Sequence, residues 1–184
     1  VHVSIVLHLC LAGITAFIWG RRGLRLGRLG AWTVGAVFAL GGYMGAQVEH
    51  VNQLQGLAWL PLMLTLADAL GRPGEEGAES VTLPSAGWSR VLTRRRVGAA
   101  AGLGLVIGMV LLAGHTQTAF ITVLGTMVYA VLPGMLHLVR RGSARPVVAV
   151  SVVLAVATVL GAGLAAVQLF PTFQLSRLSV RADG

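Results

Sequence analysis

A run of 43 residues without a charged side chain decides the fold; residues 97–139 read VGAAAGLGLVIGMVLLAGHTQTAFITVLGTMVYAVLPGMLHLV. As one α-helix, this run would be about 64 Å long, roughly twice the thickness of the hydrocarbon core of a membrane. Polar residues interrupt it near its middle, at Gly114-His115-Thr116-Gln117-Thr118. The run therefore predicts two membrane-spanning helices joined by a short turn.

The composition agrees with a membrane protein. Of the 184 residues, 55% are hydrophobic and only 11% are charged, whereas a soluble domain carries about 25% charged residues. Cys10 is the single cysteine, so the chain cannot form an internal disulfide. These figures exclude an ordinary soluble domain, a disordered chain and a disulfide scaffold.

The other stretches that lack charge extend the prediction to an all-α, polytopic transmembrane bundle of about six spans. Helices are expected because backbone polar groups in lipid must find their partners within the spanning segment. Residues 71–96 are expected to be a solvated cytoplasmic linker without a fold of its own. The predicted spans, all in one transmembrane domain formed by residues 1–184, are 1–20, 31–48, 54–70, 97–114, 119–138 and 147–167.

The arginines predict which side of the membrane each loop occupies. All 14 basic residues are arginines, which gives a net charge of +8. Alternation of six spans puts 12 of them on one side, which the positive-inside rule makes the cytoplasm. Because they are spread over three membrane-flanking loops, no nucleic-acid partner is expected. They are Arg21, Arg22, Arg25, Arg28, Arg72, Arg90, Arg94, Arg95, Arg96, Arg140, Arg141 and Arg145.

The remaining unusual polar residues gather on the opposite, outer side. The turn between the second and third spans reads Gln47-Val48-Glu49-His50-Val51-Asn52-Gln53, and His115 and Gln117 lie in the next outer turn. The sixth span ends at Gln168-Leu169-Phe170-Pro171, followed by Arg177 and Arg181. Ionisable residues at membrane depth are costly, which makes them candidate functional groups.

Each of these residues also has a structural explanation. Glu49 and His50 could form an ordinary wet turn, and His115 could satisfy backbone groups that a helix break frees. His8 is expected to be a hydrogen-bonded residue between helices, and Trp19 and Trp59 to be interface anchors. The small residues of the fourth and sixth spans predict close helix packing; they are Ala99 to Gly104, Gly161, Gly163, Ala165 and Ala166.

A functional interpretation assigns these side chains to three roles. Glu49 and His50 are the candidate catalytic residues, and with His115 they offer oxygen and nitrogen ligands for a divalent cation, the one cofactor suggested. Arg177 and Arg181, two cations on this side, suit a substrate that carries a phosphate. The candidate substrate-binding residues are Asn52, His115, Gln117, Gln168, Arg177 and Arg181.

Three short motifs, in this order, resemble the bacterial YfhO-like membrane proteins. They are His50-Val51-Asn52 before Trp59-Leu60-Pro61-Leu62, Gly114-His115-Thr116-Gln117-Thr118, and Gln168-Leu169-Phe170-Pro171. The resemblance covers residues 1–184 as an internal part of a longer protein. It implies that His50, Asn52, His115, Gln117, Gln168 and Pro171 line a cavity on the outer face of the bacterial cytoplasmic membrane.

The resemblance further implies a glycosyltransferase of the GT-C type. Such enzymes take a sugar from a polyprenyl-phosphate donor and pass it to an acceptor in the cell envelope. Their acidic catalytic residues usually lie in the first large outer loop, which would precede Val1. Two alternatives remain open from the residues alone: a transporter or flippase for a lipid-linked or anionic substrate, and a non-catalytic scaffold of envelope assembly.

Overall fold

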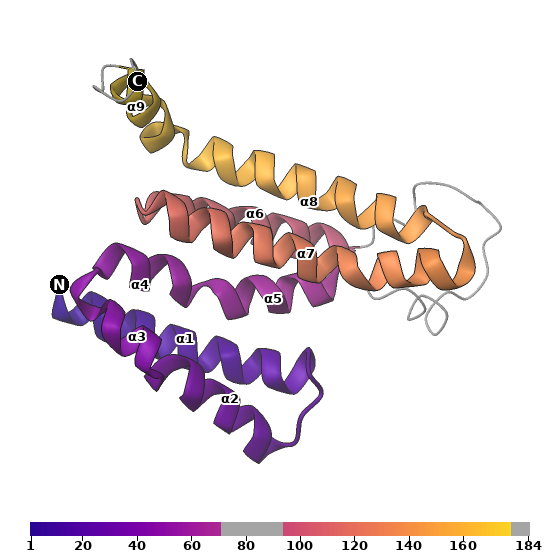
Figure 1. Cartoon of the computed structure of the whole chain (residues 1–184), viewed down its shortest axis with the longest axis horizontal. Coiled ribbons are helices and arrows are strands. Elements are labelled where there is room, and N and C mark those ends of the chain that lie inside the picture. The colour runs from indigo at the N-terminus through magenta and orange to yellow at the C-terminus, as the bar shows by residue number, and fades with distance from the viewer. Residues whose placement is uncertain (71–93, 178–184) are drawn as a thin grey trace.

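The computed structural model describes residues 1–70 and 94–177, and every regular element in these ranges is a helix (Figure 1). The prediction of an all-α bundle is therefore confirmed. The elements are α1 (His2–Arg22), α2 (Arg28–Leu40), α3 (Gly42–Ala46), the 3₁₀ turn η1 (Gln47–Glu49), α4 (Val51–Ala58), α5 (Leu60–Ala69), α6 (Arg94–Leu112), α7 (Thr116–Arg141), α8 (Arg145–Leu164) and α9 (Ala166–Arg177).

Five helical runs in the described part of the chain are long and apolar enough to cross a membrane. They are α1, the joined run of α2, α3 and η1, α6, α7 and α8. Each matches one predicted span, although α6 begins at Arg94 and α7 continues to Arg141. The helices extend beyond the apolar residues because arginines are good helix formers and need not lie in the hydrocarbon.

The remaining predicted span, 54–70, is divided between α4 and α5, which meet at Trp59. Together the two helices cover residues 51–69, about 28 Å of helix, and run from one end of the bundle to the other (Figure 1). No residue from Gln53 to Leu70 is exposed. This central crossing tolerates polar residues because neighbouring helices, and not lipid, surround it.

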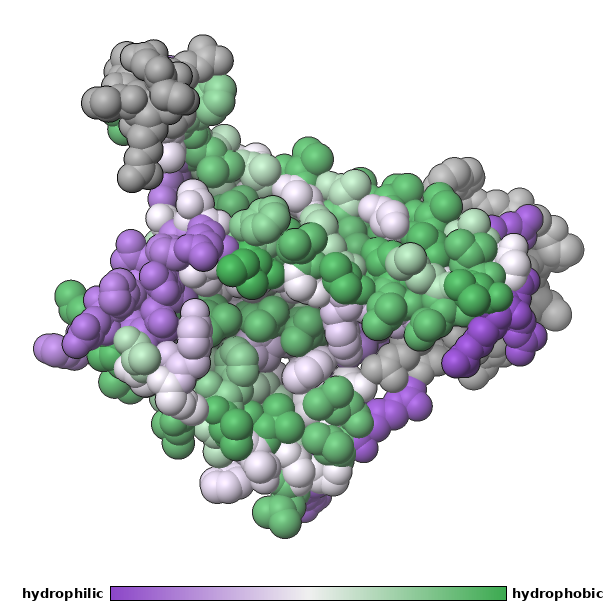
Figure 2. Space-filling view, viewed as in Figure 1, coloured by the Kyte–Doolittle hydropathy of each residue, from purple (hydrophilic) through white to green (hydrophobic). Residues whose placement is uncertain are grey.

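All described loops that carry arginines lie at one end of the bundle. The segments 21–28, 94–96 and 140–145 all lie toward the right of Figure 1, and we call this the arginine-rich end. Figure 2 shows a hydrophobic band between hydrophilic residues at the two ends. This is the arrangement expected of a multi-pass membrane protein. Arg72, Arg90 and the predicted linker up to residue 93 lie outside the described residues.

The buried residues form two separate cores. One joins α5, α6, α7 and α8 around side chains such as Met63, Leu103 and Val110. The other joins α1, α2, α3 and α4 around Met44 and Leu54. We call α1 and α2 the α1–α2 hairpin. The hairpin is thus connected to the α6–α8 part mainly through the central α4–α5 crossing.

Small residues bring α6 and α8 into close contact, as the sequence predicted. A methyl group on Gly161 would lie 2.8 Å from the carbonyl oxygen of Gly104 and 2.6 Å from Ile107 Cγ2. Gly163, in contrast, has open space around it. Gly161 therefore marks the point where the two helices cross, since only a glycine fits there.

The helix α9 differs from the prediction, in which the last span runs to about residue 167. The helix α8 ends at Leu164, and α9 leaves its axis after Ala165 (Figure 1, top left). Pro171 lies inside α9, where it removes one backbone hydrogen bond. The sequence pattern did not predict a helix through this proline.

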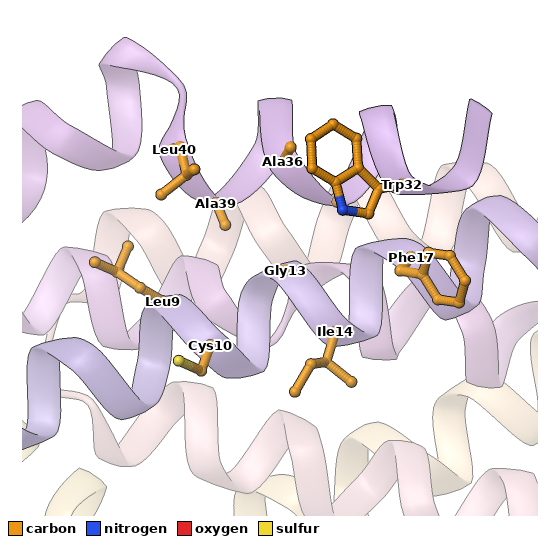
Figure 3. A pocket seen from close by; sticks show the side chains of 10 residues that line it. Leu9, Cys10, Gly13, Ile14, Phe17, Trp32, Ala36, Ala39 and Leu40 are labelled. Carbon is orange, nitrogen blue, oxygen red and sulfur yellow. The ribbon is translucent and has the colours of Figure 1, made fainter. Parts of the chain in front are cut away.

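An apolar groove of about 500 Å³ lies between α1 and α2 (Figure 3). Its floor is formed where the backbones of Gly13 and Gly35 come together. Cys10 and Phe17 line it from α1, and Trp32 from α2. Apart from the Cys10 thiol and the indole N–H of Trp32, the lining side chains are apolar, so this groove is chemically unsuited to a sugar phosphate.

Candidate functional site

The end of the bundle opposite the arginines carries the candidate site, and we call it the polar end. It contains the start of α1, the α3–η1–α4 connection, the α6–α7 turn and α9 (Figure 1). Figure 2 shows hydrophilic surface gathered there. The helices therefore bring the predicted outer residues that the structure describes to one end. The exposed ones among them are Glu49, His50, Asn52 and Gln117.

The α6–α7 turn has a fixed structure, and His115 forms its centre. Gly114 has a φ of 80°, a left-handed conformation that ends α6 and that glycine adopts without strain. His115 is the N-cap of α7, because its Nδ1 accepts a hydrogen bond from the backbone N–H of Thr118 at 3.1 Å. The Thr118 hydroxyl lies 2.8 Å from the same nitrogen. The expectation that His115 satisfies backbone groups at the break is thus confirmed.

The cap determines which nitrogen of His115 carries the proton. Since Nδ1 accepts from the Thr118 N–H, the proton of the neutral ring lies on Nε2. That atom is 3.0 Å from the carboxamide nitrogen of Gln53. Two donors cannot bond to each other, so the carboxamide is best assigned with its oxygen toward the ring. The resulting Nε2–H···O bond ties α7 to α4.

One hydrogen bond and one ring contact tie α1 to the α4–α5 crossing. The amide Nε2 of Gln55 donates to Ser4 Oγ at 2.9 Å. His8 Nδ1 lies 2.8 Å from the carbonyl oxygen of Ser4, within α1 itself. The contact of His8 with another helix is instead an edge-to-face approach of its ring to Trp59, with centroids 6.3 Å apart. Trp59 is therefore a packing residue at the α4–α5 break and does not anchor a span end.

The structure brings one further predicted residue to this turn. Gln168, half-buried on α9, faces Gly114, since a methyl group there would lie 3.1 Å from Gln168 Nε2. Motifs far apart in the sequence, around residues 53, 115 and 168, are thus neighbours in space. The side chain of Arg177 and all of Arg181 lie outside the described residues.

The predicted metal ligands do not form a ligand set. Within residues 1–70 and 94–177, no three His, Cys, Asp or Glu side chains lie close enough together to hold a metal ion. Glu49, His50 and His115 share the polar end but do not converge there. The divalent-cation prediction therefore gains no support from their arrangement.

Several polar residues of the bundle were not singled out from the sequence. Gln53, Gln55 and Ser4 form hydrogen bonds at the polar end. The available signal was Gln55 inside the predicted span 54–70, with Gln53 directly before it. At the arginine-rich end, the Tyr129 hydroxyl donates to the carboxylate of Asp68. No sequence spacing links Asp68 to Tyr129, which lie 61 residues apart.

Comparison of the chain with protein-family models, curated proteins and solved structures finds no match. The resemblance to YfhO-like proteins therefore rests on the short motifs alone. Two of those motifs, around His115 and Gln168, come together in the structure. Within the described residues, what is shown is an all-α bundle with five helical runs that could cross a membrane and a polar end opposite the loops that carry arginines.

Proposed function

We propose that this chain forms part of a membrane glycosyltransferase of the GT-C type, related to the YfhO-like proteins. The enzyme moves a sugar from a polyprenyl-phosphate donor to a cell-envelope acceptor on the outer face of the bacterial cytoplasmic membrane. The polar end is the part of this chain that contacts the substrates. The observation that carries the proposal is the bonded group Gln53–His115–Thr118, which lies beside Gln168 at that end.

The arrangement suits substrate contact better than proton transfer. His115 is half-buried, with Nδ1 occupied by the α7 cap and Nε2 bonded to Gln53. Gln53 retains a carboxamide N–H, and Gln117 and Asn52 are exposed nearby in the fold. Carboxamides can both donate to phosphate oxygens and accept from sugar hydroxyls. We assign them this binding role, with Arg177 and Arg181 as further phosphate contacts.

The proposed reaction is a substitution at the anomeric carbon of the sugar. An acceptor hydroxyl oxygen forms a bond to the anomeric carbon of the sugar, while the bond from that carbon to the phosphate oxygen breaks. A base takes the hydroxyl proton, and the polyprenyl phosphate leaves with the electron pair. We place the main base outside this chain, and we give Glu49 and His50 an acceptor contact because both are exposed at the polar end.

We expect Glu49→Gln in the complete protein to lower transfer about tenfold at limiting acceptor. Donor binding should stay unchanged, because only the acceptor contact is weakened. Radiolabel transfer from a polyprenyl-phosphate sugar measures the first quantity, and donor binding in detergent measures the second. Val48→Ala, on the exposed neighbouring residue, is the control. Unchanged transfer by Glu49→Gln at every acceptor concentration would remove Glu49 from the site.

A transporter or flippase is the second candidate, and one observation favours it. Two crossings of the bundle are interrupted, at Gly41 between α2 and α3 and at Trp59 between α4 and α5. Interrupted helices often bind substrates in transporters. Against this, the hydrogen-bonded groups around His115 and Ser4 lie at the polar end of the bundle. If the protein in proteoliposomes moves the intact polyprenyl-phosphate sugar from one leaflet to the other and releases no sugar from the phosphate, the transporter is favoured.

A further inference from the structure

The groove between α1 and α2 follows the apolar parts of both helices (Figure 3). Its walls extend from Leu9 to Phe17 on α1 and from Trp32 to Leu40 on α2, and neither range contains a charged residue. Within the described part of the chain, Ile14 is 61% exposed and Trp32 is 65% exposed, so the groove is open at the side of the bundle. Apolar surfaces of this kind do not hold ordered water. In a membrane, hydrocarbon is therefore expected to fill the groove.

An arginine continues each wall of the groove at the arginine-rich end. Arg21 follows Phe17 by four residues on α1, and Arg28 precedes Trp32 by four residues on α2. Residues four apart share one face of a helix, so each wall leads to a cation one turn beyond its last apolar side chain. Both arginines are exposed.

Arg21 is also held in position at this mouth of the groove. Its guanidinium donates a hydrogen bond to the carbonyl oxygen of Leu26, in the loop between the two helices. A guanidinium has about five N–H donors, so this bond leaves the side chain able to bind an anion. Guanidinium groups match the geometry of phosphate oxygens particularly well. The mouth of the groove therefore suits a phosphate.

The length of the groove matches one leaflet of a membrane. Leu9 is 12 positions from Arg21, and Leu40 is 12 positions from Arg28, which is about 18 Å along either helix. Half of the hydrocarbon core of a bilayer is about 15 Å thick. The groove therefore begins one turn inside the arginines and ends near the middle of the membrane. A single lipid chain from the leaflet at the arginine-rich end has this reach.

We infer that the groove binds an anionic phospholipid from this leaflet, with one acyl chain between α1 and α2 and its phosphate held by Arg21 and Arg28. Charge complementarity selects this occupant. An acyl chain gains little by leaving lipid for an equally apolar groove, so selectivity comes from the phosphate. Basic pockets between membrane helices bind anionic headgroups for this reason. The site lies away from the polar end, and it does not depend on either proposed function.

Crosslinking of a labelled lipid to the complete protein tests this site. The probe is radioactive phosphatidylglycerol with a diazirine on one acyl chain, in vesicles of phosphatidylcholine. We expect crosslinks in the groove-lining parts of α1 and α2. Unlabelled phosphatidylglycerol should compete for this labelling about tenfold better than phosphatidylcholine does, because two arginines contribute to binding the anionic headgroup.

Two variants, each with a matched control, separate the groove from the rest of the surface. Arg28→Gln should lower the groove labelling about fivefold, whereas Arg141→Gln, on an exposed arginine of α7 at the same end, should leave it unchanged. Ala36 lines the groove, so Ala36→Phe should fill it and abolish the labelling. Ala155→Phe makes the same change on an exposed residue of α8 and should have no effect.

Four results would overturn the inference. Equal losses in Arg28→Gln and Arg141→Gln would show only a general attraction of anionic lipid to this surface. Equal competition by phosphatidylcholine would show a lipid chain without headgroup selection. A disulfide between the Cys10 thiols of two copies, with Cys10 as the only cysteine, would place a second copy in the groove. Absence of crosslinks to α1 and α2 would show that another part of the complete protein covers it.

Discussion

Replacing His115 by alanine in the complete protein should reduce sugar transfer about 100-fold, which is the size of effect seen when a preorganised donor is removed from an enzyme site. The substitution removes both functions of the ring at once. It leaves the Thr118 N–H without its cap, and it frees Gln53 from the bond that positions it. Radiolabelled transfer and donor binding, measured on the purified protein, report the loss.

Two further variants help to distinguish the N-cap function of His115 from its hydrogen bond to Gln53. His115→Asn retains a good N-cap residue but lacks the ring that reaches Gln53. We expect it to restore stability while transfer stays low. His137→Ala makes the same change on a half-buried histidine of α7 near the arginine-rich end and should leave transfer intact. Full transfer by His115→Ala, or full recovery by His115→Asn, would contradict a substrate-positioning role.

The second large effect is expected at the α6–α8 crossing. Gly161→Leu places four carbons where a single methyl group already meets the Gly104 carbonyl and Ile107. Overpacking of this kind costs about 3 kcal/mol, so we expect little folded protein to be recovered. The measurement is the yield of monodisperse protein after extraction in mild detergent, together with its thermal midpoint.

Gly163→Leu is the matched control, because the same substitution two residues away points into open space. It should give a normal yield and an unchanged midpoint. Gly161→Ala should give a yield and a thermal midpoint between those of Gly161→Leu and Gly163→Leu, since one methyl group requires a shift of Ile107 and of the Gly104 backbone. A normal midpoint for Gly161→Leu would show that α6 and α8 do not cross at this glycine.

Much of the fold could be predicted because a chain that crosses lipid can adopt few secondary structures. The absence of charge over 97–139 required two helices, and the polar residues at its middle located the turn at Gly114. The arginines predicted that three loops share one end, and those parts of the loops that the structure describes do so. The α4–α5 break was not predicted, although it has a local cause, because Pro61 in the first turn of α5 has no N–H to continue the hydrogen bonds of α4. The continuation of the chain as α9 through Pro171 was not predicted either.

The candidate site was predicted in part. The sequence located its residues at one end, because alternating spans determine the end at which each turn lies. It did not indicate that His115 would bond to Gln53, or that Gln168 would face Gly114, since contacts between helices have no local pattern. The expected ligand set of Glu49, His50 and His115 does not assemble, although the same turns carry all three. The Asp68–Tyr129 pair was not predicted either, because it is also a contact between helices and has no local sequence pattern.

The central claim is that the polar end faces the outside and contacts the lipid-linked sugar. The most direct test measures sugar transfer in right-side-out membrane vesicles. These contain the complete protein with Gln117→Cys in a Cys10→Ala background. Transfer is measured before and after treatment with a membrane-impermeant maleimide. Gln117 is exposed at the polar end and Arg141 at the arginine-rich end, so Arg141→Cys is the paired variant. We predict that the reagent abolishes transfer by Gln117→Cys and leaves Arg141→Cys unaffected. Absence of transfer from the unmodified protein, or loss of transfer only in Arg141→Cys, would contradict the account.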